Sequence, residues 1–196
     1  PRSTERVQRL WTPEPMTLVT TETTLKMPVS KPCFGIGFKE QPLQHDDLRS
    51  EILYDLILCC ISGGMSRLYR KLYDEGLTNP GFGGEVLRVD GCCCILFTGE
   101  SDVPDTVRQL LLDEIARLKR EGVDEELFTL CKNQLYGELV QDLENIEDVA
   151  GALASSFFRG RTPADEIETL ASVTLSDVNG ALRAIRYIER GQEQEL

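Results

Sequence analysis

Histidine is scarce in this sequence. The 196 residues include one, His45, within the stretch Gln-His-Asp-Asp. A single imidazole among carboxylates does not match the usual ligand sets of a protein zinc site. We therefore expect His45 to be a surface residue, with no metal ligand in this chain. Long apolar runs are also missing, because no stretch approaches the roughly 18 uninterrupted apolar residues that a membrane span requires. We expect no membrane partner.

The beginning of the sequence lacks an initiator methionine and the charged-then-apolar order of a secretion signal. We therefore expect a processed or excised piece of a longer protein. Residues 1–16 are polar and include Pro13 and Pro15, which predicts a linker or arm. With 41% hydrophobic residues, the remaining 17–196 can bury one core, so we expect a single domain there.

An excess of basic residues is missing too. The formal net charge is −12, and residues 101–196 carry 20 acidic and 10 basic side chains. Nucleic-acid phosphates require the opposite sign, so nucleic acid is excluded as a partner. The acidic half favours solubility, and recruitment of basic peptides is the alternative.

Cysteine is present seven times, but no Cys-x-x-Cys spacing occurs. The clusters Cys59-Cys60 and Cys92-Cys93-Cys94 consist of adjacent residues, which cannot chelate one tetrahedral ion well. We interpret the cysteines as small buried hydrophobes in a reducing compartment, which predicts a cytoplasmic protein. A redox or metal role is the less favoured alternative.

The first half of the sequence predicts strands around one helix. Residues 16–27 are rich in Thr and Val and predict a strand, and 33–39 alternate apolar residues with glycine and predict another. Asp46 and Asp47 open a helix with an apolar residue in every turn. Stretches 82–89 and 92–98 predict a hairpin across Asp90-Gly91.

The second half predicts helices. Pro104 suits the first position of a helix, Asp124 caps a long one, and Thr162-Pro163 opens another. Thr174 and Asp177 have the spacing of a capping box before a final helix. The expected fold class is therefore α+β, with a mainly antiparallel sheet and helices packed on one face.

The stretch between these halves is the most informative part of the chain. Gly63 and Gly64 end one helix and Ser66 caps the next, in which Leu68 and Leu72 share one face. The chain then leaves this short helix at Gly76 and turns through Asn79-Pro80-Gly81 into the hairpin.

This order of residues resembles the insulinase/pitrilysin family of zinc metallopeptidases. The resemblance rests on Gly63-x-x-Ser66-Arg67-Leu68-x-x-x-Leu72, on Gly76-Leu77 and on the hairpin that follows. The helix from Pro104, the junction at 121–126 and the helix through Lys132 to Glu144 support it. The resemblance covers nearly the whole chain, from about Thr17 to Ile188.

The resemblance implies a division of labour between domains. Members of this family pair homologous domains around an enclosed chamber, with zinc on a His-x-x-Glu-His helix of one domain. A chain with one histidine cannot build that site, so it resembles the zinc-free C-terminal domain of a longer two-domain protein. The resemblance therefore implies no catalytic residue, no metal ligand and no cofactor in this chain, with zinc only in a partner domain.

The family resemblance also points to residues that could contact substrate. Relatives often carry an Arg directly after the leucine that matches Leu72 and a Tyr shortly after Gly-Leu, and here Tyr73 and Asn79 stand at or near those places. These departures argue against chemistry at this corner and suit a diverged or inactive subgroup. The expected substrate or chamber contacts are Arg67, Arg70, Tyr73, Asn79 and Phe82.

Charged side chains leave two further alternatives. Arg67, Arg70 and Lys71 could grip a peptide carboxylate, but we favour ion pairs with the acidic half. The pairs Glu138/Asp142 and Glu144/Asp148, each at one-turn spacing, could share a cation, but a solvated helix face is favoured.

The leading functional hypothesis is the non-catalytic half of a metallopeptidase-like clamshell. It would enclose a peptide substrate opposite a zinc-bearing partner domain, in the same chain or in a dimer partner. The parent would then be a hydrolase that carries out proteolysis, whereas this chain alone is expected to be inactive. The alternative is a structural or assembly module of the same fold whose parent has lost proteolysis.

Overall fold

The protein is described here from a computed structural model. It describes residues 12, 14–41, 47–89 and 91–185, and the backbone of two short strands near the end of the chain. His45, Asp46 and Asp90 lie outside the described residues, as does most of the predicted arm 1–16. In chain order the elements are β1 (Cys33–Glu40), α1 (Leu48–Ser62), α2 (Arg67–Asp74), β2 (Gly83–Val89), β3 (Cys92–Glu100), α3 (Pro104–Glu121), α4 (Glu125–Asp142), α5 (Ile146–Phe158), α6 (Pro163–Ser172), α7 (Leu175–Ala184), β4 (Tyr187–Glu189) and β5 (Gln192–Gln194).

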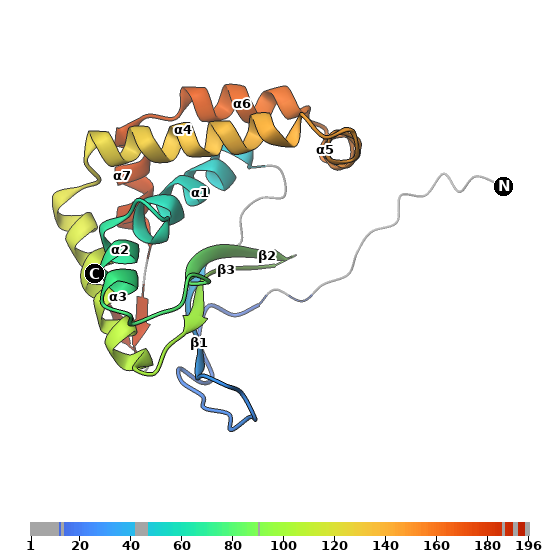
Figure 1. Ribbon diagram of the computed structural model, residues 1–196. Coiled ribbons are helices and arrows are strands. Elements are labelled where there is room, and N and C mark those ends of the chain that lie inside the picture. Colours follow the sequence, from blue (N-terminus) through green and yellow to red (C-terminus); the bar gives the residue numbers. More distant parts are fainter. Residues whose placement is uncertain are drawn as a thin grey trace.

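The first three strands form one antiparallel sheet in the order β1-β3-β2 (Figure 1). The central strand β3 shows the period of two that a half-buried strand requires. Cys93, Ile95 and Phe97 are each 1% exposed, whereas the residues between them are partly exposed. The buried side chains therefore face the helices, and the β3 side chains on the opposite face of the sheet are only partly buried. Strands β4 and β5 form a separate two-stranded sheet.

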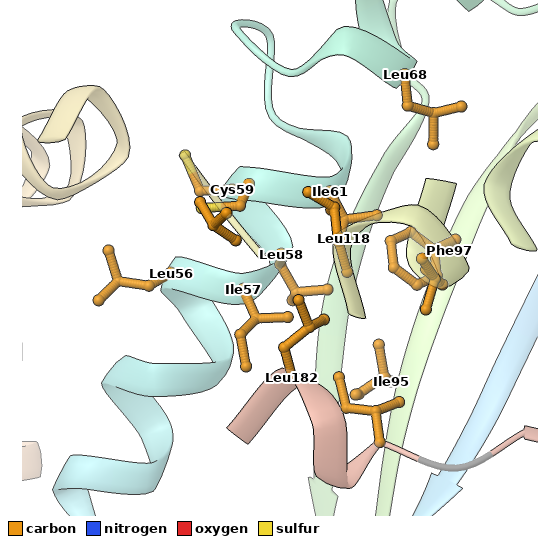
Figure 2. Close-up of a cluster of buried hydrophobic side chains, with 14 of the residues drawn as sticks. Leu56, Ile57, Leu58, Cys59, Ile61, Leu68, Ile95, Phe97, Leu118 and Leu182 are labelled. Atoms are coloured by element: carbon orange, nitrogen blue, oxygen red, sulfur yellow. The ribbon is translucent and has the colours of Figure 1, made fainter. Parts of the chain in front are cut away.

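Helix α1 is the centre of the hydrophobic core. Leu56, Ile57 and Ile61 are each at most 1% exposed, and burying such a side chain contributes about 1.5–3 kcal/mol. Figure 2 shows Ile57 and Ile61 on the side of α1 that faces Ile95 and Phe97 of β3, whereas Leu56 projects from the other side of the helix. The same cluster takes in side chains from three more helices: Leu68 of α2, Leu118 of α3 and Leu182 of α7.

The helical half of the chain packs around α1. Helices α4 and α6 contact each other and both contact α1, while α7 contacts α1 and α3 (Figure 1). Helices thus gather on one face of an antiparallel sheet. The predicted α+β class is confirmed.

Most predicted helix starts are confirmed by their hydrogen bonds. At the start of α1, the Asp47 carboxylate accepts a hydrogen bond from the Ser50 N–H at 3.0 Å. At the start of α2, the Ser66 hydroxyl accepts a hydrogen bond from the Tyr69 N–H at 3.1 Å. The Asp124 carboxylate likewise caps α4, and Thr174 and Asp177 form the predicted capping box of α7. These caps satisfy N–H groups that the first turn of a helix leaves unpaired.

Two predictions about secondary structure were wrong. Residues 16–27 form no strand, and Val19 and Leu25 are largely exposed. High β-propensity does not make a strand without a neighbour to pair with, and no described strand pairs with this segment. In addition, the helix that contains Lys132 ends at Asp142, and the separate helix α5 follows. Glu144 and Asp148 are therefore not one turn apart on a single helix.

One described stretch, Leu48–Asp74, is long and apolar enough to cross a membrane by length and composition alone. It is interrupted between α1 and α2, and half of its apolar window is buried. These properties are those of a core helix, and length and composition alone are weak evidence for a membrane span.

Candidate functional site

The corner between α1 and β2 is held by local hydrogen bonds. Gly63 ends α1, and its N–H donates to the Cys59 carbonyl at 3.0 Å. Ser66 is fully buried as the cap of α2, and Leu68 and Leu72 of α2 are 3% and 0% exposed. The apolar face of α2 therefore packs into the core and leaves its polar face in solvent.

A groove lies where this corner meets α4. It has a volume of about 590 Å³ and runs between α1, the Tyr69 side of α2, the start of β2 and the middle of α4. Its lining includes Leu58, Gly83, Val86 and Leu135. Because α4 belongs to the second half of the chain, this groove forms only when the whole domain is folded.

The close approach of α1 to β2 depends on Gly84. A Cβ atom on Gly84 would lie 2.8 Å from Leu58 Cδ2 and 2.8 Å from Phe97 Cε1. Both distances are far shorter than a normal carbon contact of about 3.5–4.0 Å. The missing side chain thus lets the helix sit directly on the strand, which fixes one wall of the groove.

The basic residues of α2 face solvent. Arg67, Arg70 and Lys71 are exposed, and none forms an ion pair with another described residue. The favoured prediction, ion pairs with the acidic half, is therefore wrong for the described chain. Acidic residues of that half pair elsewhere; Asp177, for example, accepts from Arg49 at 2.8 Å.

The other expected contact residues differ in accessibility. Tyr73 is 53% exposed and its ring stacks on that of Tyr69, with centroids 6.2 Å apart. Asn79 is partly buried and its amide donates to a Glu100 carboxylate oxygen at 3.1 Å. Phe82 is 3% exposed, so its ring belongs to the core beneath the groove and offers little surface. Contact of these residues with a substrate stays a prediction.

Carboxylates gather beside the groove. Glu138 and Asp142 of α4 line a second cavity of about 200 Å³ between α1, α4 and α6. In that cavity Arg161, with 12% of its side chain exposed, pairs with Glu51 at 2.9 Å and with Glu166 at 3.4 Å. Within the described ranges, no group of three or more His, Cys, Asp or Glu side chains is arranged to hold a metal ion.

The cysteine side chains are mostly inside the protein. Cys59, Cys60, Cys93 and Cys131 are buried, whereas Cys33 is exposed, and all seven thiols are free. Burial raises the pKa of Cys93 to about 11. A thiol with so high a pKa stays protonated and unreactive near neutral pH, which agrees with the interpretation of these cysteines as small hydrophobes.

The groove was not predicted from the sequence, although one of its carboxylates, Glu138, was singled out there as a partner of Asp142. Asp55, Glu85 and Glu138 line the groove from three different elements, α1, β2 and α4. These three residues are far apart in the sequence, and their spacing does not indicate that they lie at one site. Sequence reasoning identified the corner, but not the helix that completes the site.

Comparison with known proteins identifies the fold and the family. The family model described as the peptidase M16 inactive domain matches residues 8–135. No curated protein matches this chain. A candidate M16-like peptidase from Alicyclobacillus acidocaldarius has 24% identity and a TM-score of 0.74, over 79% of this chain and 38% of that one.

Two solved inactive domains have the same fold. The inactive peptidase domain of a candidate zinc protease from Bordetella parapertussis has 18% identity and a TM-score of 0.66, over 83% of this chain and 88% of that one. The peptidase M16 inactive domain from Pseudomonas fluorescens has 16% identity and a TM-score of 0.64, over 78% of this chain and 38% of that one. Identities this low show the fold alone. The present chain thus spans well under half the length of some of the chains it resembles.

Proposed function

This chain belongs to the peptidase M16 inactive-domain family, and we propose that it forms the non-catalytic half of a zinc-metallopeptidase-like clamshell. In this proposal it encloses a peptide substrate opposite a zinc-bearing partner domain that lies outside the chain. The family match is the observation that carries the proposal. The whole protein would then be a peptidase to which this chain contributes shape and surface.

The residues of this chain do not fit a zinc site of its own. One histidine cannot supply the two imidazoles of a His-x-x-Glu-His helix. Zinc, when bound by the partner domain, would polarise the scissile carbonyl and activate water. In this proposal, the role of the present chain is to hold the peptide in place and to exclude bulk water around it.

The surface at the α1–β2 corner supports such a holding role. The groove is open, and its lining mixes apolar and carboxylate side chains. Helix α2, whose Tyr69 lines the groove, also carries Arg67 and Arg70, which form no ion pair with a described residue. Binding sites commonly combine a mostly apolar hollow with a few polar groups that orient the ligand. We also propose a cytoplasmic location, which is supported by seven free thiols.

The alternative is a structural or assembly module whose parent has lost proteolysis. Tyr73 and Asn79 favour this alternative, because they stand at or near places where relatives carry an Arg and a Tyr that hold substrate. The adjoining upstream sequence separates the two functions. An intact His-x-x-Glu-His motif there supports the peptidase half, and an eroded motif supports the module.

The proposed function is tested with the intact parent protein and with a form that lacks this chain. We expect the intact protein to hydrolyse a mixture of unstructured peptides in a zinc-dependent reaction, and the shortened form to lose most of that activity. Zinc content, measured on both forms, controls for loss of the metal. Equal hydrolysis by both forms, or none by either, would contradict the proposal.

A further inference from the structure

Helix α5 presents a row of apolar side chains to solvent. We propose that this row docks into an apolar groove with a basic rim on the zinc-bearing half of the parent protein. The proposal rests on the proposed function only in taking that half as the partner. It adds the surface of this chain that meets the partner and the chemistry of the surface that receives it.

α5 is amphipathic in a direction that does not face the core. Four apolar residues stand at positions i, i+4, i+7 and i+11 and form one row along the helix: Ile146, Ala150, Leu153 and Phe157. The three large side chains of this apolar row, Ile146, Leu153 and Phe157, are 83%, 53% and 78% exposed. The buried residue of the helix, Ser156, points about a quarter turn away from the row.

The rest of the described chain holds α5 weakly. It contacts α6, and Figure 1 shows it beyond the ends of α4 and α6, at the outside of the helical layer. The helix has 13 residues, and isolated helices shorter than about 12–15 residues are marginal in water. Most helices in proteins are stabilised by packing of their apolar face. The apolar row therefore needs a cover from outside the described residues.

The exposed aromatic rings favour a permanent partner over a transient one. Phe157 and its neighbour Phe158 are 78% and 86% exposed, and their rings meet edge to face with centroids 5.9 Å apart. Large apolar patches in contact with water mark interaction sites, and aromatic anchors are typical of the buried centre of an interface. Amphipathic helices commonly bind by laying such a row of anchors into an apolar groove.

Charge indicates the sign of the rim of the receiving groove. Glu144, Glu147 and Asp148 lie at the beginning of α5, and all three are exposed. None of these carboxylates forms an ion pair with a described residue. A partner that buries the apolar row brings its own rim close to them, where cations attract the carboxylates and acidic residues repel them. The receiving surface is therefore an apolar groove that is basic at one end.

A second copy of this chain is a poor partner for α5. The groove at the α1–β2 corner is lined by Asp55, Glu85 and Glu138, whose charges repel the acidic beginning of α5. Pairing of α5 with its own copy would bury mainly one apolar row from each side, whereas stable interfaces usually take about 20–30 residues a side. In the Alicyclobacillus acidocaldarius chain, more than half of the length lies outside the part that this chain covers, which leaves room for a partner surface.

The proposal is tested in the intact parent protein by photo-crosslinking from α5. Phe157 is replaced by the photoreactive residue p-benzoylphenylalanine, and mass spectrometry locates the residue to which it becomes attached. We expect attachment within the same molecule, at an apolar residue of the zinc-bearing half with a lysine or arginine nearby. Attachment to a second copy, to residues 1–196 of the same molecule, or to no protein residue would overturn the proposal.

Ser155 provides the matched control position. It is exposed on the opposite side of α5 from the apolar row. With the photoreactive residue at this position, we expect at most a tenth of the cross-linked product that position 157 gives. Equal yields from the two positions would contradict docking through the apolar row.

Hydrogen exchange tests whether docking protects the helix. We expect the α5 amides to exchange at least tenfold more slowly in the intact parent than in this chain alone. In the parent, Phe157→Asp should remove this protection, because it places a charge in an apolar contact, and Ser155→Asp should leave it within about twofold. Equal exchange in the parent and the chain alone, or equal effects of the two variants, would refute docking. In the chain alone both variants should keep the urea midpoint, since both side chains are exposed there.

Failure of docking is separable from failure of the proposed function. Photo-crosslinking and hydrogen exchange are measured without any cleaved peptide. Zinc-dependent cleavage by a parent in which α5 is unprotected would refute docking alone. A docked α5 in a parent that cleaves no peptide would refute the proposed function alone.

Discussion

The contact between α1 and β2 can be tested by one added methyl group. In Gly84→Ala the new Cβ lies 2.8 Å from both Leu58 Cδ2 and Phe97 Cε1, and both are core side chains with little room to move. Overpacking of this kind usually costs about 1–3 kcal/mol. Alanine in place of a strand glycine returns roughly 0.5–1 kcal/mol through reduced chain entropy. We therefore expect Gly84→Ala to lower the free energy of unfolding by up to about 2.5 kcal/mol, with about 1 kcal/mol as the central value.

The neighbouring residue provides the matched control. Gly83→Ala places its Cβ on the same strand with no atom within 4 Å. Only the entropy effect remains there, so we expect stability to be unchanged or to rise by up to about 1 kcal/mol. Urea unfolding followed by circular dichroism gives both values, and equal m-values show that the comparison is valid.

A second substitution tests the cause of the Gly84 effect. Leu58→Ala truncates one of the two side chains that the new methyl group meets, at its own cost of about 2–5 kcal/mol. In the double variant, we expect Gly84→Ala to cost less than it does in the natural background. If Gly84→Ala and Gly83→Ala are equally stable, or if Leu58→Ala makes no difference, then α1 does not sit against β2 as described.

Three further predictions follow from charge and burial. Burial raises the pKa of Asp55 in the folded protein, so its ionisation opposes folding; Asp55→Asn should raise stability in urea unfolding at neutral pH, with the gain fading as the pH falls through the raised pKa and absent below the ordinary pKa of aspartate. Hydrogen bonds from Thr174 lower the pKa of Asp177, so that carboxylate stabilises the fold above its unfolded pKa and the effect is lost as the pH falls; Thr174→Ala should cost about 1 kcal/mol in urea unfolding at neutral pH and less in acid. Maleimide should label Cys33 in the native protein and Cys59 only after unfolding, as read by mass spectrometry, and equal labelling rates would contradict the assigned burial.

Features encoded within a few residues were predicted correctly from the sequence. The Ser66 cap of α2 and the Thr174–Asp177 capping box each depend on residues three apart, and both form as predicted. The hairpin of β2 and β3 is similarly local and was also predicted. Local hydrogen bonds of this kind can be read without knowing what else surrounds the segment.

Features that depend on distant partners were not predicted. Residues 16–27 have the composition of a strand, but no described strand pairs with them, and composition contains no information about a partner. The groove requires Leu135 of α4 to lie near Gly83 of β2, although about fifty residues separate them in the sequence. The predicted ion pairs of Arg67, Arg70 and Lys71 failed for the same reason, because the number of charges in each half of the chain does not determine which side chains come together.

We propose above all that this chain is the half of a peptidase-like protein that binds no zinc and cleaves no peptide. The most direct measurement is zinc content and peptide turnover of the purified chain alone after incubation with excess zinc. We predict well under one tightly bound zinc per chain and no cleavage. Stoichiometric zinc together with zinc-dependent turnover, both lost in His45→Ala, would contradict the claim.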